Sequence, residues 1–275
     1  MNKQKKIKDF NRAANVYDQN AVMQHQIAED LIDRLRFIKI KPKKILDIGS
    51  GTGATSKKLI DLYPDADIYE IDIAIEMLKK SKSNNTTIIK SFFKRNNITY
   101  INADMDLIPF DTQSFDLIIS SSSIQWSSNI NKLFENIFTL LRPEGLFIFS
   151  SFLKNTLPEL QSFSDSKLTN EFCSIQEYAQ MLISNQFYDP ILMKDEFRID
   201  YKDALSALRD LKKIGATKSS NVHKGLRSRQ FLRNLIQHMD QYKIDNKNYL
   251  TYEVLFAHAW KLNNSQEKSI SFIKS

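Results

Sequence analysis

Three of the chain's six glycines lie within five residues, from Gly49 to Gly53. The apolar run Lys44 to Ile48 before them is typical of a short buried strand, and helical spacing of apolar residues returns from Ala54 to Leu62. Glycine can adopt positive φ angles and allows a ligand to approach the backbone closely. A strand, a glycine loop and a helix in this order therefore indicate a nucleoside-binding turn in an α/β fold. A tight turn without a ligand is the competing interpretation.

An acidic residue in the next expected strand favours the nucleoside site. Asp72 lies nineteen residues beyond Gly53, at the end of the expected strand Ala66 to Asp72, where a carboxylate can accept hydrogen bonds from both ribose hydroxyls. The glycines depart from the dinucleotide pattern Gly-x-Gly-x-x-Gly, and the loop lacks the Gly-Lys-Ser/Thr ending of a phosphate-binding loop. Instead the order is Asp47-x-Gly-x-Gly-x-Gly, with an acid ahead of the glycines.

The hydrophobic pattern predicts alternating helices and strands up to residue 152 and a looser order beyond it. Further helices are expected around Phe10 to Tyr17 and over Val22 to Phe37, Asn131 to Leu141, Ile175 to Ser184, Asp203 to Lys213 and Arg229 to Lys243. Further strands are expected over Ile98 to Asn102, Phe115 to Ser120, Leu146 to Phe152, Ile191 to Ile199 and Tyr249 to Trp260. Such alternation implies right-handed crossovers and a mostly parallel sheet.

The composition limits the cellular location of the protein and the kinds of ligand and partner that it can have. No apolar stretch approaches the roughly 20 residues needed to span a bilayer, and the basic start of the chain is not followed by the apolar run of a secretory signal. The single cysteine, Cys173, excludes an internal disulfide framework. The four histidines share no metal-ligand spacing. We therefore expect a cytoplasmic protein without a metal site or a membrane partner.

The net charge of +7 is concentrated late in the chain. Between Leu208 and Lys243 nine basic residues face two acids; the basic residues are Arg209, Lys212, Lys213, Lys218, Lys224, Arg227, Arg229, Arg233 and Lys243. This cluster fits an acidic protein partner, and a solvated helix face is an equally open interpretation. Because the chain has no Asn-Pro-Pro-Tyr base-flipping motif, a nucleic-acid partner is not expected.

The acid and glycines from Asp47 to Gly53 resemble motif I of the class I S-adenosylmethionine-dependent methyltransferases, whose ligand carries an amino acid in place of a pyrophosphate. Ala103-Asp104, Ser114 to Ser120 and Leu140 to Gly145 resemble later motifs of the same class. The resemblance implies that S-adenosylmethionine is bound and S-adenosylhomocysteine is released, without a metal. The implied cofactor residues are Asp47, Gly49, Ser50, Gly51, Gly53, Asp72, Ile73, Met77, Ala103, Asp104, Met105 and Ser120.

Segments outside those motifs resemble the malonyl-acyl-carrier-protein O-methyltransferases that open pimeloyl synthesis for biotin. The matching segments are Phe10 to Tyr17, Ser120 to Trp126, Leu157 to Leu160, Asp203 to Thr217 and Leu250 to Val254, and the stretch from Arg209 to Thr217 is the most specific. Ser121 stands where this family has asparagine.

The resemblance implies a Rossmann-like, doubly wound α/β fold with a mostly parallel seven-stranded sheet, an antiparallel last strand and a helical cap. We expect a single methyltransferase domain over residues 1–275. Within it we expect N-terminal helices over the active site at 1–40, a cofactor-binding core at 41–200, a helical cap insertion at 201–247 and the last strand at 248–262.

The implied reaction is methyl transfer to the free carboxylate of a malonyl thioester, which gives the methyl ester that primes pimeloyl and biotin synthesis. The substrate would be malonyl-acyl-carrier protein or malonyl-coenzyme A. The alternative is a methyltransferase for another small molecule, such as a quinone precursor or the free acid aconitate. The sequence leaves open the oligomeric state, the choice between carrier protein and coenzyme A, and the acyl chain length accepted.

A malonyl carboxylate is ionised at pH 7, so its methylation requires no general base. The enzyme must align the carboxylate with the methyl group and remove water from it. An arginine can hold a carboxylate with two hydrogen bonds, and Tyr and Trp donors can orient it. The candidates are Arg209, Tyr17, Gln125 and Trp126. Whether Tyr17 or Arg209 contacts the carboxylate stays open, and each candidate could instead serve packing or a surface.

Overall fold

The computed structural model describes residues 3–89, 97–163, 170–213 and 229–263. Its centre is a seven-stranded sheet with the strand order β3-β2-β1-β4-β5-β7-β6. The strands are β1 Lys44–Ile48, β2 Asp67–Asp72, β3 Ile98–Asn102, β4 Phe115–Ser120, β5 Leu141–Phe152, β6 Tyr188–Tyr201 and β7 Asn248–Trp260. Strands β1 to β5 pair in parallel, and β7 runs antiparallel to both β5 and β6. The predicted fold class is confirmed.

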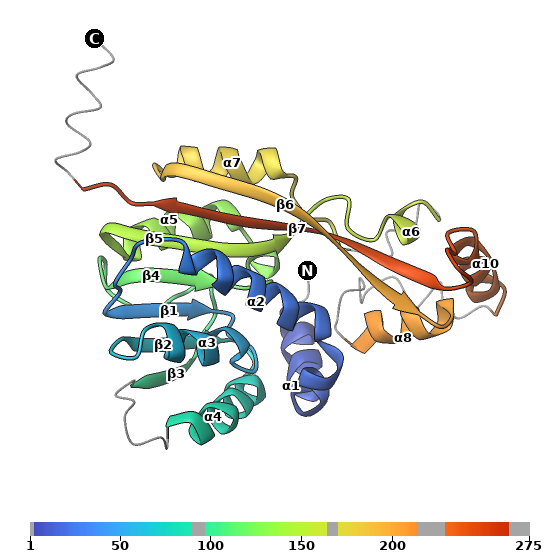
Figure 1. The fold of residues 1–275 in the computed structure, drawn as a ribbon, viewed down its shortest axis with the longest axis horizontal. Coiled ribbons are helices and arrows are strands. Elements are labelled where there is room, and N and C mark those ends of the chain that lie inside the picture. The colour runs from blue at the N-terminus through green and yellow to red at the C-terminus, as the bar shows by residue number, and fades with distance from the viewer. Residues whose placement is uncertain (1–2, 90–96, 164–169, 214–228, 264–275) are drawn as a thin grey trace, which may run out of the picture.

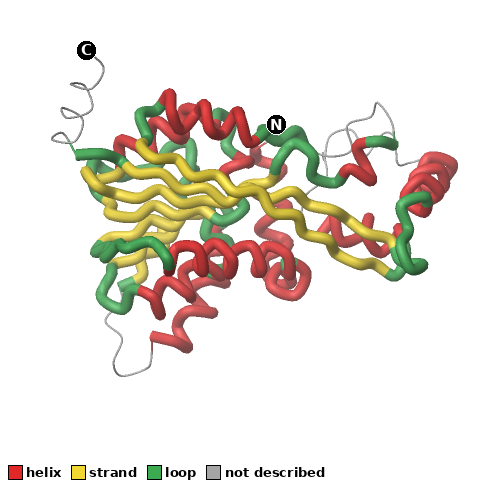
Figure 2. The backbone as a smooth tube through the Cα atoms, turned by 45° about the horizontal axis from the view of Figure 1, so that its top comes forward, coloured by secondary structure: helices red, strands yellow, loops and turns green. Residues whose placement is uncertain are grey.

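Helices cover both faces of the sheet (Figures 1 and 2). They are α1 Lys3–Asn20, α2 Val22–Arg36, α3 Ala54–Leu62, α4 Ile75–Ile89, α5 Ile130–Leu140, α6 Pro158–Gln161, α7 Ile175–Ser184, α8 Ala204–Lys213 and α10 Arg229–Asp240, with a 3-10 turn η1 at Ile124–Trp126. Local signals set several helix starts. Asn129 accepts a hydrogen bond from the Lys132 N–H before α5, and Ser174 and Glu177 form a reciprocal capping box at α7.

The two faces of the sheet carry separate hydrophobic layers. Ile45 and Ile148 point into the layer shared with α2 and α3, and their neighbours Leu46 and Phe149 point into the layer shared with α5 and α7. All four side chains are almost fully buried. Burial on both faces explains why the central strands are continuous apolar runs.

Strand β5 begins at Leu141, earlier than the predicted start at Leu146. Leu141 pairs with Phe115 of β4 before a register shift, and the Glu144 N–H donates to the Lys261 carbonyl at 2.7 Å. These partners come from segments distant in sequence. Residues 142–145, which lie between the predicted helix and the predicted strand, therefore belong to the sheet.

Strands β6 and β7 extend beyond the rest of the sheet and reach α8 and α10 (Figure 1). Leu211 of α8 and Leu235 of α10 are buried in one cluster with Leu250 and Tyr252 of β7. No helix in the described part of the chain is long and apolar enough to cross a membrane. The carboxyl ends of β1 and β4 meet where the strand order reverses, which is where open α/β sheets bind ligands.

Candidate cofactor and acceptor site

The glycine loop follows β1 and is fixed to the neighbouring strand. The N–H groups of Gly49 and Ser50 donate to the Ile71 carbonyl of β2 at 2.8 and 3.1 Å. Gly49, Gly51 and Gly53 have φ angles of +68°, +56° and +84°, a region that favours glycine. The cluster of glycines therefore reflects a backbone that L side chains rarely adopt.

The three glycines differ in what a Cβ would meet. At Gly49 it would lie 2.3 Å from Ser123 Oγ, and at Gly53 it would lie 2.2 Å from Ser81 Oγ. At Gly51 it would meet nothing within 4 Å, because this residue faces a cavity. Gly49 and Gly53 therefore serve close packing, and Gly51 leaves space in the cavity.

Eight of the twelve predicted cofactor residues line this cavity: Gly49, Gly51, Asp72, Ile73, Met77, Ala103, Asp104 and Met105. The cavity lies at the carboxyl ends of the strands, and α1 contributes Lys3, Lys6, Phe10 and Tyr17 to its wall. Asp47, Ser50, Gly53 and Ser120 do not line it. The Ser120 hydroxyl donates to the Ile48 carbonyl at 2.9 Å and thus holds the ends of β1 and β4 together.

Asp72 at the end of β2 joins the glycine loop to the following turn. Its Oδ2 accepts from the Gly51 N–H at 3.0 Å and its Oδ1 accepts from the Ala74 N–H at 2.7 Å. Burial raises the pKa of Asp72 to about 6, although these backbone hydrogen bonds oppose the shift. The carboxyl borders the cavity, where its expected role toward ribose hydroxyls stays a prediction.

Two buried carboxyls lie side by side behind the loop. Asp47 of β1 and Glu70 of β2 are register partners, and both are almost fully buried. Glu70 accepts from Ser81 Oγ at 2.6 Å and from Asn85 Nδ2 at 3.0 Å. Burial raises the pKa of Glu70 to about 7. Burial, and next the nearby charge of Glu70, raises the pKa of Asp47 well above its usual value.

One oxygen of Asp47 has no hydrogen-bond partner in the described ranges of the chain. Its Oδ2 accepts from Ser56 Oγ at 2.8 Å, whereas the buried Oδ1 accepts no hydrogen bond. A buried acceptor without a donor is costly, and a carboxyl with a raised pKa reduces that cost because it stays protonated.

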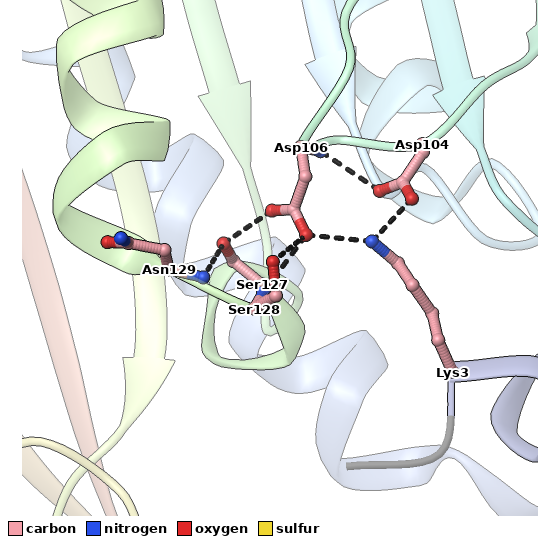
Figure 3. A network of polar contacts seen from close by, with 6 residues as sticks. All are labelled: Lys3, Asp104, Asp106, Ser127, Ser128 and Asn129. Atoms are coloured by element: carbon pink, nitrogen blue, oxygen red, sulfur yellow. Dashed lines mark hydrogen bonds and ion pairs between the residues drawn. The ribbon is translucent and has the colours of Figure 1, made fainter.

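A polar network fastens the start of α1 across the cavity (Figure 3). The Lys3 ammonium donates to Asp106 at 2.7 Å and forms an ion pair with Asp104. Ser127 Oγ donates to the other Asp106 oxygen at 2.6 Å, and the Ser128 N–H donates to the oxygen that Lys3 contacts at 3.0 Å. Burial opposes the shift, but these hydrogen bonds lower the pKa of Asp106 to about 2. Asp106 therefore stays ionised and connects α1 to the turn after β4.

The far end of α1 is fastened to the glycine loop. Asp18 accepts from Thr52 Oγ1 at 2.5 Å and from Asn84 Nδ2 at 3.2 Å. The neighbouring Tyr17 lines the cavity, and burial together with the negative charges of Asp72 and Asp18 raises its pKa. The Tyr17 hydroxyl is therefore protonated at neutral pH and can act as a donor.

Trp126 forms the other wall. Phe10 of α1 and Phe172 each approach its ring with centroids 6.4 Å apart, and the Lys6 ammonium lies 3.2 Å from the ring centroid. This cation over an indole face was not foreseen from the sequence, because a lysine in a lysine-rich N-terminal helix carries no signal of its own.

The structure separates the four predicted acceptor residues. Tyr17 and Trp126 line the cavity, but Gln125 and Arg209 do not. Gln125 is buried, donates to the Ser122 carbonyl at 2.7 Å and accepts from Ser151 Oγ at 3.1 Å. Arg209 is exposed on α8. The expected roles of all four residues stay predictions. The stretch 214–217 of the most specific match, and Lys218, Lys224 and Arg227, lie outside the described residues.

Comparison with known proteins defines the class. A family model described as a methyltransferase domain matches residues 40–205. The YcgJ protein of Bacillus subtilis has the same fold, with a TM-score of 0.63 at 15% identity, and the comparison covers 86% of this chain and 99% of that one. A phosphoethanolamine N-methyltransferase from Haemonchus contortus, solved with S-adenosylhomocysteine, gives a TM-score of 0.52 at 15% identity over 86% of this chain and 52% of that one. The protein is an S-adenosylmethionine-dependent methyltransferase.

Curated relatives define the family within this class. The malonyl-[acyl-carrier protein] O-methyltransferase of a Methylovorus species is 34% identical, over 92% of this chain and 87% of the relative. The enzyme of that name from Nitrosospira multiformis is 32% identical, over 95% of this chain and 90% of the relative. The chain belongs to the malonyl-[acyl-carrier protein] O-methyltransferase family.

Proposed function

We propose that the protein transfers the methyl group of S-adenosylmethionine to the free carboxylate of malonyl-acyl-carrier protein. The product is the methyl ester that primes pimeloyl and biotin synthesis. The main support for this proposal is the length of chain over which the family similarity extends. The methyltransferase domain model ends at residue 205, whereas the relatives named for this acceptor match more than nine-tenths of the chain. The similarity therefore includes the segments of α1 and of the late helices, where an acceptor would be recognised.

The residues of the cavity fit the cofactor. Gly51 leaves room beside the backbone, Asp72 offers a carboxylate to ribose hydroxyls, and Ala103 and Asp104 border the part of the cavity expected to hold adenine. When bound, S-adenosylmethionine supplies an electrophilic methyl group on a sulfonium.

The chain's own residues need to bind and orient the acceptor rather than remove a proton. A malonyl carboxylate is already an anion at neutral pH, because ordinary carboxylic acids have pKa values of roughly 4. Tyr17 can donate one hydrogen bond, since its hydroxyl stays protonated. The rings of Phe10 and Trp126 line one side of the cavity and exclude water there, and Phe172 packs against Trp126. Catalysis on this account is alignment and desolvation.

The carrier domain is proposed to approach the basic late part of the chain. Among the described residues of that part, Arg209, Arg229 and Arg233 are exposed. Such a surface favours encounter with an acidic carrier protein more than it fixes affinity. Acceptance of malonyl-coenzyme A, a cytoplasmic location, and a reaction without metal, nucleic acid or membrane stay predictions.

A substrate panel tests the proposal. Purified protein would be incubated with methyl-labelled S-adenosylmethionine and with malonyl-acyl-carrier protein, malonyl-coenzyme A, free malonate or aconitate. We expect label on the malonyl thioesters as a base-labile methyl ester, with the carrier-protein form preferred. Methylation of aconitate, with none of the malonyl thioesters, would overturn the assignment of the acceptor and leave the methyltransferase class intact.

A further inference from the structure

The Lys6 ammonium is buried in the wall of the cavity and has no anionic partner within the described part of the chain. Its Nζ is shielded from solvent and donates no hydrogen bond to any residue that the structure describes. It lies 3.2 Å from the centroid of the Trp126 ring, within the range of a cation–π contact. A buried ammonium that contacts only an aromatic face has lost most of its hydration. Such a group is suited to an anion that arrives with a ligand.

The acids around the cavity are already engaged elsewhere. Asp104 and Asp106 bind Lys3, one turn before Lys6 on α1. Asp72 accepts from two backbone N–H groups and is assigned to the cofactor in the proposed function. Tyr17, the other titratable group of α1 that lines the cavity, is neutral. Lys6 is therefore the described lysine of this wall that is left for an incoming negative charge.

We propose that the Lys6 ammonium binds the free carboxylate of the acceptor beside Trp126, holding one carboxylate oxygen and leaving the other to attack the methyl group. This inference rests on the proposed function, because it requires an anionic acceptor. It assigns the carboxylate to a residue of α1 inside the cavity, whereas the predicted Arg209 is exposed on α8.

The charges of substrate and product differ, and this difference affects how strongly Lys6 binds each of them. The acceptor oxygen forms a bond to the methyl carbon while the carbon–sulfur bond breaks. The electron pair of the broken bond stays on sulfur. A carboxylate and a sulfonium thus become a neutral ester and a neutral thioether. The ester offers Lys6 no charge, so the ion pair that favours substrate binding is lost with the product. Lys6 therefore discriminates substrate from product and favours release.

Protonation of Lys6 should control acceptor binding. Burial lowers the pKa of Lys6 to about 7. Below this pKa the ammonium is present, and above it a proton must be taken up when the carboxylate binds. We expect kcat/KM for the acceptor to fall as the pH rises above about 7, whereas kcat, which reports the bound state, holds to higher pH.

The experiment compares Lys6→Met, Lys6→Arg and Lys8→Met in the full-length protein. Methionine keeps an unbranched apolar side chain over Trp126 and removes the charge. Lys8 is exposed on the same helix, so Lys8→Met is a matched control for the loss of one positive charge. We would measure kcat and KM for malonyl-acyl-carrier protein, the pH dependence of kcat/KM, inhibition by the methyl ester product, and S-adenosylmethionine affinity by calorimetry.

Lys6→Met should raise KM for the acceptor by about 10- to 100-fold, as expected for a charge-assisted hydrogen bond. Its affinity for the cationic cofactor should stay the same or increase, inhibition by the ester should not change, and the decline of kcat/KM above pH 7 should disappear. Lys6→Arg should retain activity to higher pH because a guanidinium stays protonated. Lys8→Met should behave as wild type.

Two results would overturn the inference without affecting the proposed function. One is a wild-type KM in Lys6→Met, and the other is a parallel loss of acceptor and cofactor affinity, which would show that Lys6 only holds α1 in place. If the wild-type protein methylated no malonyl thioester at all, the proposed function would fail first, and the Lys6 assignment would fail with it.

Discussion

The three glycines of the loop after β1 have the same kind of backbone but different surroundings. Their positive φ angles cost an L side chain about 1–2 kcal/mol each. At Gly49 and Gly53 a Cβ would also collide with a serine side chain, whereas at Gly51 it would enter the open cavity. A substitution at Gly51 should therefore affect ligand binding, and a substitution at Gly49 should affect folding.

Gly51→Val is expected to abolish S-adenosylmethionine binding and to leave the fold intact apart from backbone strain of about 1–2 kcal/mol. Calorimetry measures the binding, and urea unfolding measures the stability. Gly49→Val is the matched comparison, and it should unfold at lower urea than Gly51→Val because its side chain meets Ser123. Normal cofactor affinity in Gly51→Val would place the cofactor elsewhere.

Glu70 makes a separate contribution to stability. Its folded-state pKa of about 7 lies above its usual value of 4.5, because its carboxyl is buried. For a raised pKa the stabilising contribution is complete below pH 4.5 and is lost as the pH rises through 7. The wild-type protein must ionise a buried carboxyl at pH 8, and a glutamine at this position need not.

The difference in unfolding free energy between Glu70→Gln and wild type should therefore shift in favour of the variant as the pH rises from 4.5 to 8. The expected shift is on the order of 1–3 kcal/mol. Urea unfolding at the two pH values measures this difference. Glu135→Gln, on an exposed face of α5, serves as the control and should show little pH-dependent change. Equal behaviour of the two variants would mean that Glu70 is ionised in the folded protein at pH 8 without penalty.

Among the elements, α1 completes the site. It lines one wall of the cavity with four side chains and is fastened at its start by Lys3 and at its end by Asp18. The Lys3 ammonium reaches Asp106 from 103 residues away in the sequence. The Lys3 side chain is itself 38% exposed, so its ion pairs are partly screened by solvent and salt.

Lys3→Met should loosen the start of α1 without unfolding the protein. We expect faster amide hydrogen exchange in the first turns of α1, and S-adenosylmethionine affinity weaker by a few-fold, since a partly exposed pair contributes about 1 kcal/mol or less. Lys79→Met, which removes a surface ion pair with Glu76 inside α4, should change neither measurement. Unchanged exchange in Lys3→Met would show that apolar contacts alone hold the helix.

At the scale of the whole molecule, the charge of +7 raises the question of where a carrier protein docks. Arg229 and Arg233 on α10 are exposed, and they belong to the basic cluster of the late segment. Lys41 and Lys43 are also exposed, but they lie before β1, at the opposite end of that strand from the glycine loop. The two pairs allow the same change of charge to be tested in two places.

Changing Arg229 and Arg233 together to glutamine should raise KM for malonyl-acyl-carrier protein by about 3- to 10-fold at low salt and flatten its salt dependence. The reaction with malonyl-coenzyme A, which presents no carrier surface, should change much less. The double Lys41→Gln, Lys43→Gln variant should leave both reactions near wild type. Equal losses on both substrates in the arginine variant would mean that these residues shape the cap instead of the docking surface.

The sequence by itself determined the alternation of strands and helices, the mostly parallel character of the sheet and the position of the glycine loop. These features depend on local patterns, because apolar runs, glycines and Asp72 all lie within one strand-helix-strand unit, and a right-handed crossover brings its ends together. Ala103 and Asp104, which were selected by the family resemblance, follow β3 and line the cavity, and their role toward adenine stays a prediction.

Only the tertiary structure decided which side chains outside the glycine loop line the cavity and which do not. Lys3 and Lys6 belong to a lysine-rich helix whose pattern does not distinguish buried from exposed charges. Gln125 is hydrogen-bonded to Ser122 in its own turn and to Ser151 of β5, 26 residues away. The extension of β5 through the Arg142 turn likewise depends on a partner from after β7. In each case the deciding contact joins segments far apart in the chain, and its desolvation and hydrogen-bond energies exist only once those segments have packed together.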